Sequence, residues 1–350
     1  MATIAAALKI RFRDPQVEMA HGAGGKASRR LVEGLFAPLL FGSDSAAEPL
    51  GDAAHLDFGG TRIAITTDSF VVRPLRFPGG SIGELAVNGT VNDLAVSGAR
   101  AEALVVSYVL EAGLPTPVLE AEVRAMGEAA RHAGVIIVSG DTKVVEHGKA
   151  DCMYITTAGI GRAIPGLRMS PRLVRPGDQV ILSGPIGDHG ITILLARGDL
   201  DLESDLRSDT RPVLPLVEAL IEAASPGLRW MRDPTRGGLA TSLNELARDC
   251  GLGIVLREDW IPLRDAVRGA CELLGLDPLH IANEGQFVAV LAPEFADLAL
   301  DALQRTPGGE GAATIGEVRE VPAATVLGIA PYGGTRVIDM LVGDPLPRIC

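Results

Sequence analysis

Five acidic residues in this sequence have surroundings that suit metal and phosphate chemistry. Each lies in a turn flanked by glycine or asparagine or near the end of an expected element: Asp52, Asp68, Asp93, Asp141 and Asp233. Carboxylates that converge from several elements suit Mg²⁺, which takes oxygen ligands and commonly bridges to substrate phosphates. Any one of them alone is more simply a helix cap or a turn acid. Five together favour a site for magnesium and ATP.

A cysteine ends the chain. Cys350 follows Pro345 and Pro347, and because proline fixes φ and lacks a backbone donor, this end of the chain should be extended. We expect residues 331–350 to form a mobile tail that brings the thiol to a site elsewhere. The plainer interpretation is that Cys350 is an accidental chain end. Small core residues are the simplest interpretation of the other cysteines, Cys152, Cys250 and Cys271.

Other familiar catalytic patterns are weak or absent. The glycine-rich stretch His21–Lys26 could bring backbone N–H groups to a phosphate, but its spacing is not that of a P-loop. No G-x-G-x-x-G follows an expected strand, and neither G-x-S-x-G nor H-E-x-x-H occurs. The sequence therefore lacks the motifs that usually indicate nucleotide-dependent reduction, serine hydrolysis or zinc proteolysis. Three histidines are either proton carriers or ordinary turn residues: His21, His147 and His189.

The elements expected around these residues form two α+β halves. The β-branched stretch 61–67 predicts a strand that ends at Asp68, and Ser81 with Glu84 predicts a capping box that opens a helix over 82–97. A strand at 135–138 should run directly into a polar turn at 139–143. Further strands are expected at 104–110, 154–160, 179–182, 253–257, 286–291, 313–318 and 324–329, and further helices at 117–133, 213–224, 263–275 and 294–304.

A turn-rich connector between Pro165 and Asp178 marks the expected domain boundary. The chain would then consist of a glycine-rich segment and helix, a first domain, a second domain and the tail, at residues 1–43, 44–162, 170–330 and 331–350.

Composition narrows the class of protein. The chain has 350 residues, 47% of them hydrophobic, and a formal net charge of −12. This charge argues against binding to nucleic acid or to an anionic membrane surface, since both need clustered Lys and Arg. The N-terminal apolar patch precedes its basic residues, unlike a secretory signal, and no segment is apolar for long enough to span a bilayer. We expect a cytoplasmic protein.

Several longer motifs resemble the HypE family of hydrogenase maturation proteins. They span nearly the whole chain and lie at residues 88–99, 139–145, 187–190, 232–238, 282–285 and 345–350. The resemblance implies an α+β, two-domain PurM-like fold of the superfamily that includes aminoimidazole ribonucleotide synthetase. It also implies a homodimer in which the first domains pair through their sheets into a β-barrel.

The resemblance further implies a reaction. Members of this family are carbamoyl dehydratases, which use ATP to dehydrate a carbamoyl group carried on the terminal cysteine, here Cys350. The product is a protein thiocyanate that supplies cyanide ligands to iron in [NiFe]-hydrogenase maturation. The implied partners are a HypF-type carbamoyltransferase and an iron-carrying HypC–HypD complex.

Residue roles follow from the same resemblance as hypotheses. Glu284 would act as general base, because a partly buried carboxylate with a raised pKa suits that role. Lys143 would steady the phosphates. Mg²⁺ would be held by Asp68, Asp93, Asp141 and Asp233, and the ATP site would also include Asn88 and Asn92.

Three alternatives stay open. Selenophosphate synthetase needs a reactive residue near its N-terminus, whereas the first cysteine here is Cys152. Thiamine monophosphate kinase has no use for a C-terminal thiol. A non-catalytic ATP-binding scaffold would lack turnover on a carbamoylated tail.

Overall fold

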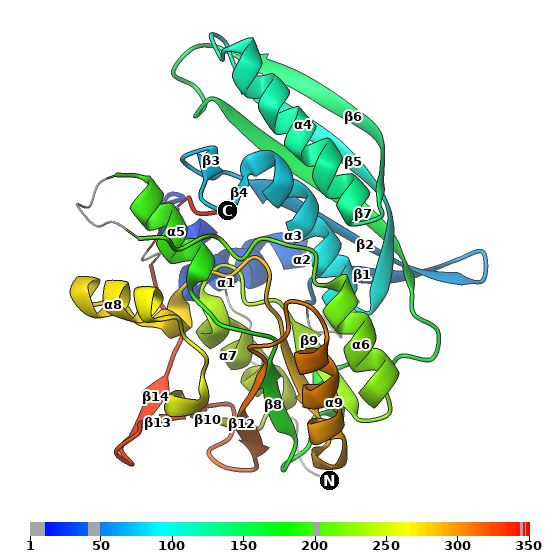
Figure 1. The fold of residues 1–350 in the computed structure, drawn as a ribbon, viewed down its shortest axis with the longest axis vertical. Coiled ribbons are helices and arrows are strands. Elements are labelled where there is room, and N and C mark those ends of the chain that lie inside the picture. The colour runs from blue at the N-terminus through cyan, green and yellow to red at the C-terminus, as the bar shows by residue number, and fades with distance from the viewer. Residues whose placement is uncertain (1–10, 41–49, 199–203, 344–345, 347) are drawn as a thin grey trace.

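A computed structural model of the chain describes residues 11–40, 50–198, 204–343, 346 and 348–350. It consists of two α+β domains, each built on one large sheet (Figure 1). The first sheet has five strands in the order β1-β2-β7-β5-β6, and the second has seven in the order β14-β13-β10-β12-β8-β11-β9. The predicted α+β, two-domain architecture is therefore confirmed.

The first domain covers only one face of its sheet with helices. Its strands are β1 (Ala54–Phe58), β2 (Thr61–Phe70), β5 (Ala99–Glu111), β6 (Ile136–Val145) and β7 (Met153–Ala163), and its helices are α3 (Ile82–Val96) and α4 (Thr116–His132). Burial alternates along β7, so its even-numbered residues point away from the helices. A short hairpin, β3 (Arg76–Phe77) and β4 (Gly80–Ser81), leads into α3.

Helix α3 is buried on nearly every side because it lies between the first sheet and the second domain. It contacts β2 and β7 on one side and α6 and β9 on the other. Its start at Ile82 agrees with the prediction, but the predicted capping box does not form. Ser81 pairs with Arg76 in the β3–β4 hairpin, and its hydroxyl makes no capping hydrogen bond.

The second domain carries helices around its seven-stranded sheet. Its strands are β8 (Gln179–Leu182), β9 (Leu228–Arg232), β10 (Gly253–Arg257), β11 (Val288–Leu291), β12 (Ala313–Arg319), β13 (Val326–Ile329) and β14 (Thr335–Ile338). Its helices are α5 (Asp188–Ala196), α6 (Leu214–Ala224), α7 (Gly238–Cys250), α8 (Asp265–Leu274) and α9 (Pro293–Arg305).

The structure contains β-strand in two places where the sequence analysis expected none. The stretch 139–143, expected as a turn after a strand, lies inside β6, which pairs in parallel with β5 as far as Val145. The stretch from 331, expected to be tail, contains β14, which pairs antiparallel with β13. In both cases the ladder of a neighbouring strand satisfies the backbone, which local composition does not reveal.

The N-terminal glycine-rich segment packs against the second domain. Helices α1 (Lys26–Leu31) and α2 (Ala37–Leu40) follow it. Gly24 has φ +75°, and a Cβ there would lie 2.3 Å from the carbonyl oxygen of Arg236, so only glycine fits this approach. The amide of Lys26 donates to the carbonyl of Leu341 at 2.8 Å. The N-terminal glycine-rich segment thus meets the stretch after β14 beside α7.

No helix within the described residues is both long enough and apolar enough to cross a bilayer.

Candidate functional site

Acidic side chains from both domains gather where the domains meet. Asp68 lies on β2 and Asp93 on α3, whereas Asp233 follows β9 and Glu284 precedes β11. Asp52 lies in the segment before β1. The charges of neighbouring acids raise the pKa values of Asp93, Asp233 and Glu284, so these carboxylates lie close together. Sequence reasoning predicted Asp68, Asp93 and Asp233 as one group, and the structure brings them together.

Burial raises the pKa values of several acids in this cluster. Burial raises the pKa of Asp93 well above its ordinary value, and the charges of Asp233 and Asp52 raise it further. Asp233 is also buried, and its pKa is raised in the same way, by burial first and Asp52 second, despite the opposing charge of Arg232. Such crowded carboxylates are poised to accept a cation.

The hydroxyl of Thr66 lies beside the cluster. It is 2.8 Å from the Asp52 carbonyl oxygen and 2.8 Å from a carboxylate oxygen of Asp93. The hydrogen bond from Thr66 lowers the pKa of Asp93, but burial and the charges of the neighbouring acids outweigh it.

Glu284 is the most buried acid of the cluster. Its side chain is 4% exposed, and one carboxylate oxygen has no hydrogen-bond partner among the described residues. Burial, followed by the charges of Asp68 and Asp209, raises its pKa well above the ordinary value. A carboxylate in this state suits proton abstraction near neutral pH.

Asp209 holds the loop that carries Glu284, and the sequence analysis missed it. Its carboxylate accepts the backbone N–H groups of Glu284 and Gly285, both at 3.1 Å. Asn283, in the same loop, accepts the N–H of Gly187 at 2.7 Å and donates to the carbonyl of Pro234 at 2.9 Å. Asp209 stands outside every recognisable motif, so no sequence signal pointed to it.

Two arginines border the cluster, and they do different things. Arg232 lies 2.8 Å from Asp52 and 2.5 Å from Glu245, so its charge is used inside the fold. Arg236 lies 3.8 Å from Asp68 and donates to the carbonyl of Gly22 at 3.3 Å. Arg236 therefore links the N-terminal glycine-rich segment to the acidic cluster.

Asp141 and Lys143 do not join the cluster within one chain. They form an ion pair with each other at 2.9 Å, and both side chains are exposed. Register places Asp141 beside Ser107 and Lys143 beside Val109, on the sheet face opposite α3. The prediction that they share a site with Asp93 thus has no support from a single chain, because β6 continues through them instead of ending in a loop.

The two predicted asparagines of α3 differ. Asn92 uses its amide N–H groups on the carbonyls of Arg211 and Glu284, each at 2.9 Å, and its carbonyl accepts the N–H of Val213. Asn92 therefore links the two domains, and both of its amide protons are used in these hydrogen bonds. Asn88 donates to Thr210, whereas its buried carbonyl oxygen has no partner among the described residues. Asn88 alone retains a group for a ligand.

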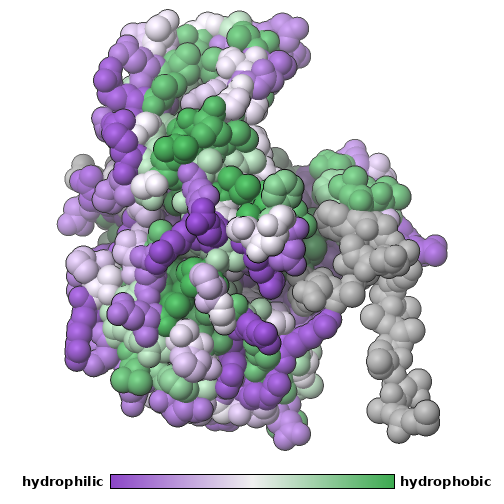
Figure 2. All heavy atoms as spheres, turned by 90° about the vertical axis from the view of Figure 1, so that its right-hand side faces the viewer, coloured by the Kyte–Doolittle hydropathy of each residue, from purple (hydrophilic) through white to green (hydrophobic). Residues whose placement is uncertain are grey.

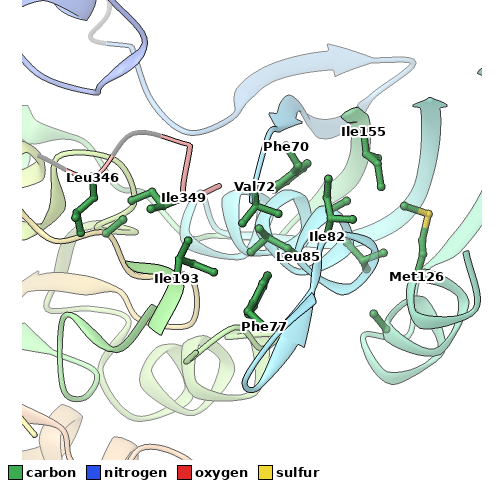
Figure 3. Close-up of a cluster of buried hydrophobic side chains, with 14 of the residues drawn as sticks. Phe70, Val72, Phe77, Ile82, Leu85, Met126, Ile155, Ile193, Leu346 and Ile349 are labelled. Atoms are coloured by element: carbon green, nitrogen blue, oxygen red, sulfur yellow. The ribbon is translucent and has the colours of Figure 1, made fainter. Parts of the chain in front are cut away.

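The C-terminal residues are docked beside the cluster. The Cys350 carbonyl accepts the N–H of Val71 at 3.1 Å, and the Arg348 carbonyl accepts the N–H of Arg73 at 3.3 Å. Val71 lies three residues after Asp68 along an extended segment, about 10 Å further on. Figure 3 shows Ile349 and Leu346 among the apolar side chains of α5 and the first domain, and both are buried.

The cluster fits a magnesium ion that also binds phosphates, but not a cage made by the protein alone. Among the described residues no three His, Cys, Asp or Glu side chains come together as ligands for a metal. Mg²⁺ in phosphoryl-transfer sites usually needs one or two carboxylates, with phosphates and water completing its shell. Asp68, Asp93 and Asp233 supply hard oxygen donors of that kind.

The three predicted histidines have structural contacts. His21 lies 2.8 Å from Asp14 and accepts the N–H of Glu18, and exposed His147 lies 3.1 Å from Glu111. His189 is fully buried and contacts the C-terminal segment.

Two domains of this fold, with an acidic site between them, define the class of AIR synthase related proteins. Residues 50–163 match the N-terminal domain of that family, and residues 175–328 match its C-terminal domain.

The relatives narrow the class further. The chain is 48% identical over 342 residues to the carbamoyl dehydratase HypE of Azotobacter vinelandii. The aligned region covers 98% of this chain and 99% of that protein. The crystal structure of a HypE–HypF complex matches with a TM-score of 0.83 and 41% identity, covering 89% of this chain and 99% of the other. A crystal structure of HypE in complex with ATP matches with a TM-score of 0.79 and 44% identity. The match covers 96% of this chain and 100% of the other. The chain belongs to the carbamoyl dehydratase HypE family.

Proposed function

We propose that this chain dehydrates a carbamoyl group carried on the thiol of Cys350, at the expense of ATP, and so forms a protein thiocyanate for hydrogenase maturation. Family membership supports the class of reaction. The observation that carries the residue assignment is the docking of Cys350 onto the segment after Asp68, beside the acidic cluster.

The reaction balances without any other reactant. The carbamoyl oxygen bonds to the γ-phosphorus of ATP as the bond to ADP breaks. The carbon–oxygen bond then breaks with its electron pair, and phosphate leaves. Both N–H protons are lost, and their electron pairs complete the carbon–nitrogen triple bond. The products are thiocyanate, ADP, phosphate and two protons, of which Glu284 accepts one and phosphate or solvent the other. The oxygen of the formal water ends in phosphate.

The cluster's acids divide the work by environment. Glu284 takes a proton from the carbamoyl nitrogen, because its raised pKa makes it a stronger base than an exposed carboxylate. One or two of Asp68, Asp93 and Asp233 would hold Mg²⁺ together with the phosphates, and the bound ion would neutralise phosphate charge. Asn88 offers its unpartnered carbonyl oxygen to the nucleotide.

We also propose that the chain works as a homodimer formed through the uncovered face of the five-stranded sheet. Ile65 and Ile160 lie opposite each other in register on that face, 38% and 39% exposed, and Val105 is 41% exposed. Figure 2 shows the molecule from the side of this sheet, with apolar side chains gathered over its upper part. Asp141 and Lys143 would lie at such an interface, where a neighbouring chain could bring them to a nucleotide.

The partners follow from the chemistry of a thiol that must be loaded and unloaded. A HypF-type carbamoyltransferase would load Cys350, in keeping with the HypE–HypF complex known for a relative. An iron-carrying HypC–HypD complex would accept the cyanide. Both steps require the terminal residues to leave the docked position.

Mass spectrometry tests the reaction. Full-length protein carbamoylated at Cys350 should lose one water from the C-terminal peptide when Mg-ATP is added and should keep its mass when it is withheld. A Cys350→Ala variant, treated identically, is the control for carbamoylation elsewhere. A carbamoyl mass that persists while ATP binding is demonstrated would contradict the dehydratase and favour the scaffold interpretation.

A further inference from the structure

The three terminal residues dock through both side chains and backbone. Ile349 is buried, and the Arg348 guanidinium pairs with Asp151. The carbonyls of Arg348 and Cys350 accept backbone N–H groups of the first domain, and the Arg348 carbonyl also accepts from Arg197 of the second domain at 2.8 Å. The Ile349 carbonyl between them accepts a hydrogen bond from His189 Nε2 at 2.6 Å. The docked segment is therefore held from both domains (Figure 1).

The tautomer of His189 is set by its contact with the Ile349 carbonyl. A carbonyl oxygen can only accept, so in the neutral ring Nε2 carries the proton and donates it to Ile349. Nδ1 is then the acceptor, and the hydroxyl of Ser208, 2.8 Å away, donates to it. Ser208 Oγ also accepts the N–H of Thr210 at 3.1 Å.

The surroundings of His189 keep the ring neutral and fixed. The side chain is fully buried, and burial lowers its pKa to about 4. The ring of Phe77 packs edge-on against it with centroids 5.6 Å apart. Both ring nitrogens are already engaged, so His189 is poorly placed to shuttle protons during dehydration.

We propose that His189 is a positioning residue that holds the C-terminal segment in its docked position. Combined with the proposed function, this would make His189 one determinant of how often the Cys350 thiol is presented to the ATP site. The segment must also undock for loading, so the hydrogen bond need only bias an equilibrium.

Thiol alkylation under native conditions tests the proposal in the full-length chain. Cys350 is half-buried when docked, so its reaction with iodoacetamide should accelerate as the undocked fraction rises. His189→Leu keeps an apolar side chain but loses the donor, and we expect Cys350 to react about five- to tenfold faster, the usual effect of one hydrogen bond. His189→Gln retains an N–H donor and should react at close to the wild-type rate.

Buried Cys271 serves as the internal control for unfolding, since a structural defect alone would expose it too. An unchanged Cys350 rate in His189→Leu, with Cys271 still protected, would overturn the proposal, as would equal acceleration in His189→Gln. If His189→Leu unfolds, Ser208→Ala replaces it. Loss of the Ser208 hydrogen bond to Nδ1 should make Cys350 react severalfold faster with iodoacetamide. A wild-type rate in this variant would contradict the positioning role of His189. The assay uses neither ATP nor a carbamoyl group, so its result is independent of whether dehydration occurs.

Discussion

Burial of several acids, reinforced by the repulsion of their charges, is the dominant property of the site at the level of single residues. Burial raises the pKa of Asp93, Asp233 and Glu284, and nearby acidic charges raise all three pKa values further. A carboxyl whose folded pKa is raised stabilises the fold only while protonated, and this contribution is lost as pH rises through the folded pKa. At neutral pH without a cation, the cluster therefore lowers the free energy of unfolding, and binding of a cation would offset this loss.

Asp93→Asn should separate stability from function. A neutral amide avoids the cost of burying a titratable acid, so the free energy of unfolding should rise by about 1 kcal/mol without Mg-ATP at pH 7, while dehydration of carbamoylated Cys350 falls at least tenfold. Asparagine preserves the contact with Thr66, so the fold is otherwise unchanged. Chemical denaturation and single-turnover mass spectrometry measure the two effects. Exposed Asp297, changed to Asn, is the control, and a destabilised Asp93→Asn would contradict this account.

Helix α3 links the site to both domains at the level of elements. It presents Asp93 to the cluster, and through Asn92 it fixes the carbonyl of Glu284 and the segment at Arg211 and Val213. The amide of Asn92 is 2% exposed, so these hydrogen bonds have no ready replacement by water. The position of the proposed base therefore depends on a helix from the other domain.

Asn92→Asp should weaken both the fold and the chemistry. It replaces two donated hydrogen bonds by repulsion between oxygens, and we expect a loss of about 3 kcal/mol in the free energy of unfolding. Asn244→Asp is a matched control, since Asn244 also donates to two carbonyls, those of Ala240 and Ile338. Both variants should be destabilised in urea. At temperatures where both are folded, only Asn92→Asp should slow dehydration, and equal slowing would contradict a specific role for α3.

At the scale of the whole molecule, the described helices leave one face of the five-stranded sheet uncovered. Ile65, Val105 and Ile160 lie there, whereas α3 and α4 cover the opposite face. An apolar face on a monomer usually marks an interface.

Ile160→Glu should convert the proposed dimer to a monomer, because a buried unpaired charge at an interface costs several kcal/mol. Analytical ultracentrifugation at micromolar concentration measures the mass. Leu298→Glu places the same charge on an exposed apolar position of α9 and should leave the mass unchanged. A monomeric wild type, or a dimer that survives Ile160→Glu, would remove the support for pairing through this face.

The sequence by itself determined the class of fold, the order of most elements and the identity of the central acids. Periodic and β-branched patterns are local, so β2 and α3 were predicted close to their observed bounds. Asp93 and Asp233 stood out within motifs and Asp68 at the end of an expected strand, and the terminal position of Cys350 was visible at once.

Only the tertiary structure decided which groups meet. Strand β6 continues through Asp141, and β14 joins the second sheet. Both are stabilised by backbone hydrogen bonds to a neighbouring strand, which no local sequence pattern encodes. Asp209 and His189 acquired their roles from contacts 75 and 160 residues away in the sequence. Such contacts depend on how the two domains pack, and packing is a property of the folded whole.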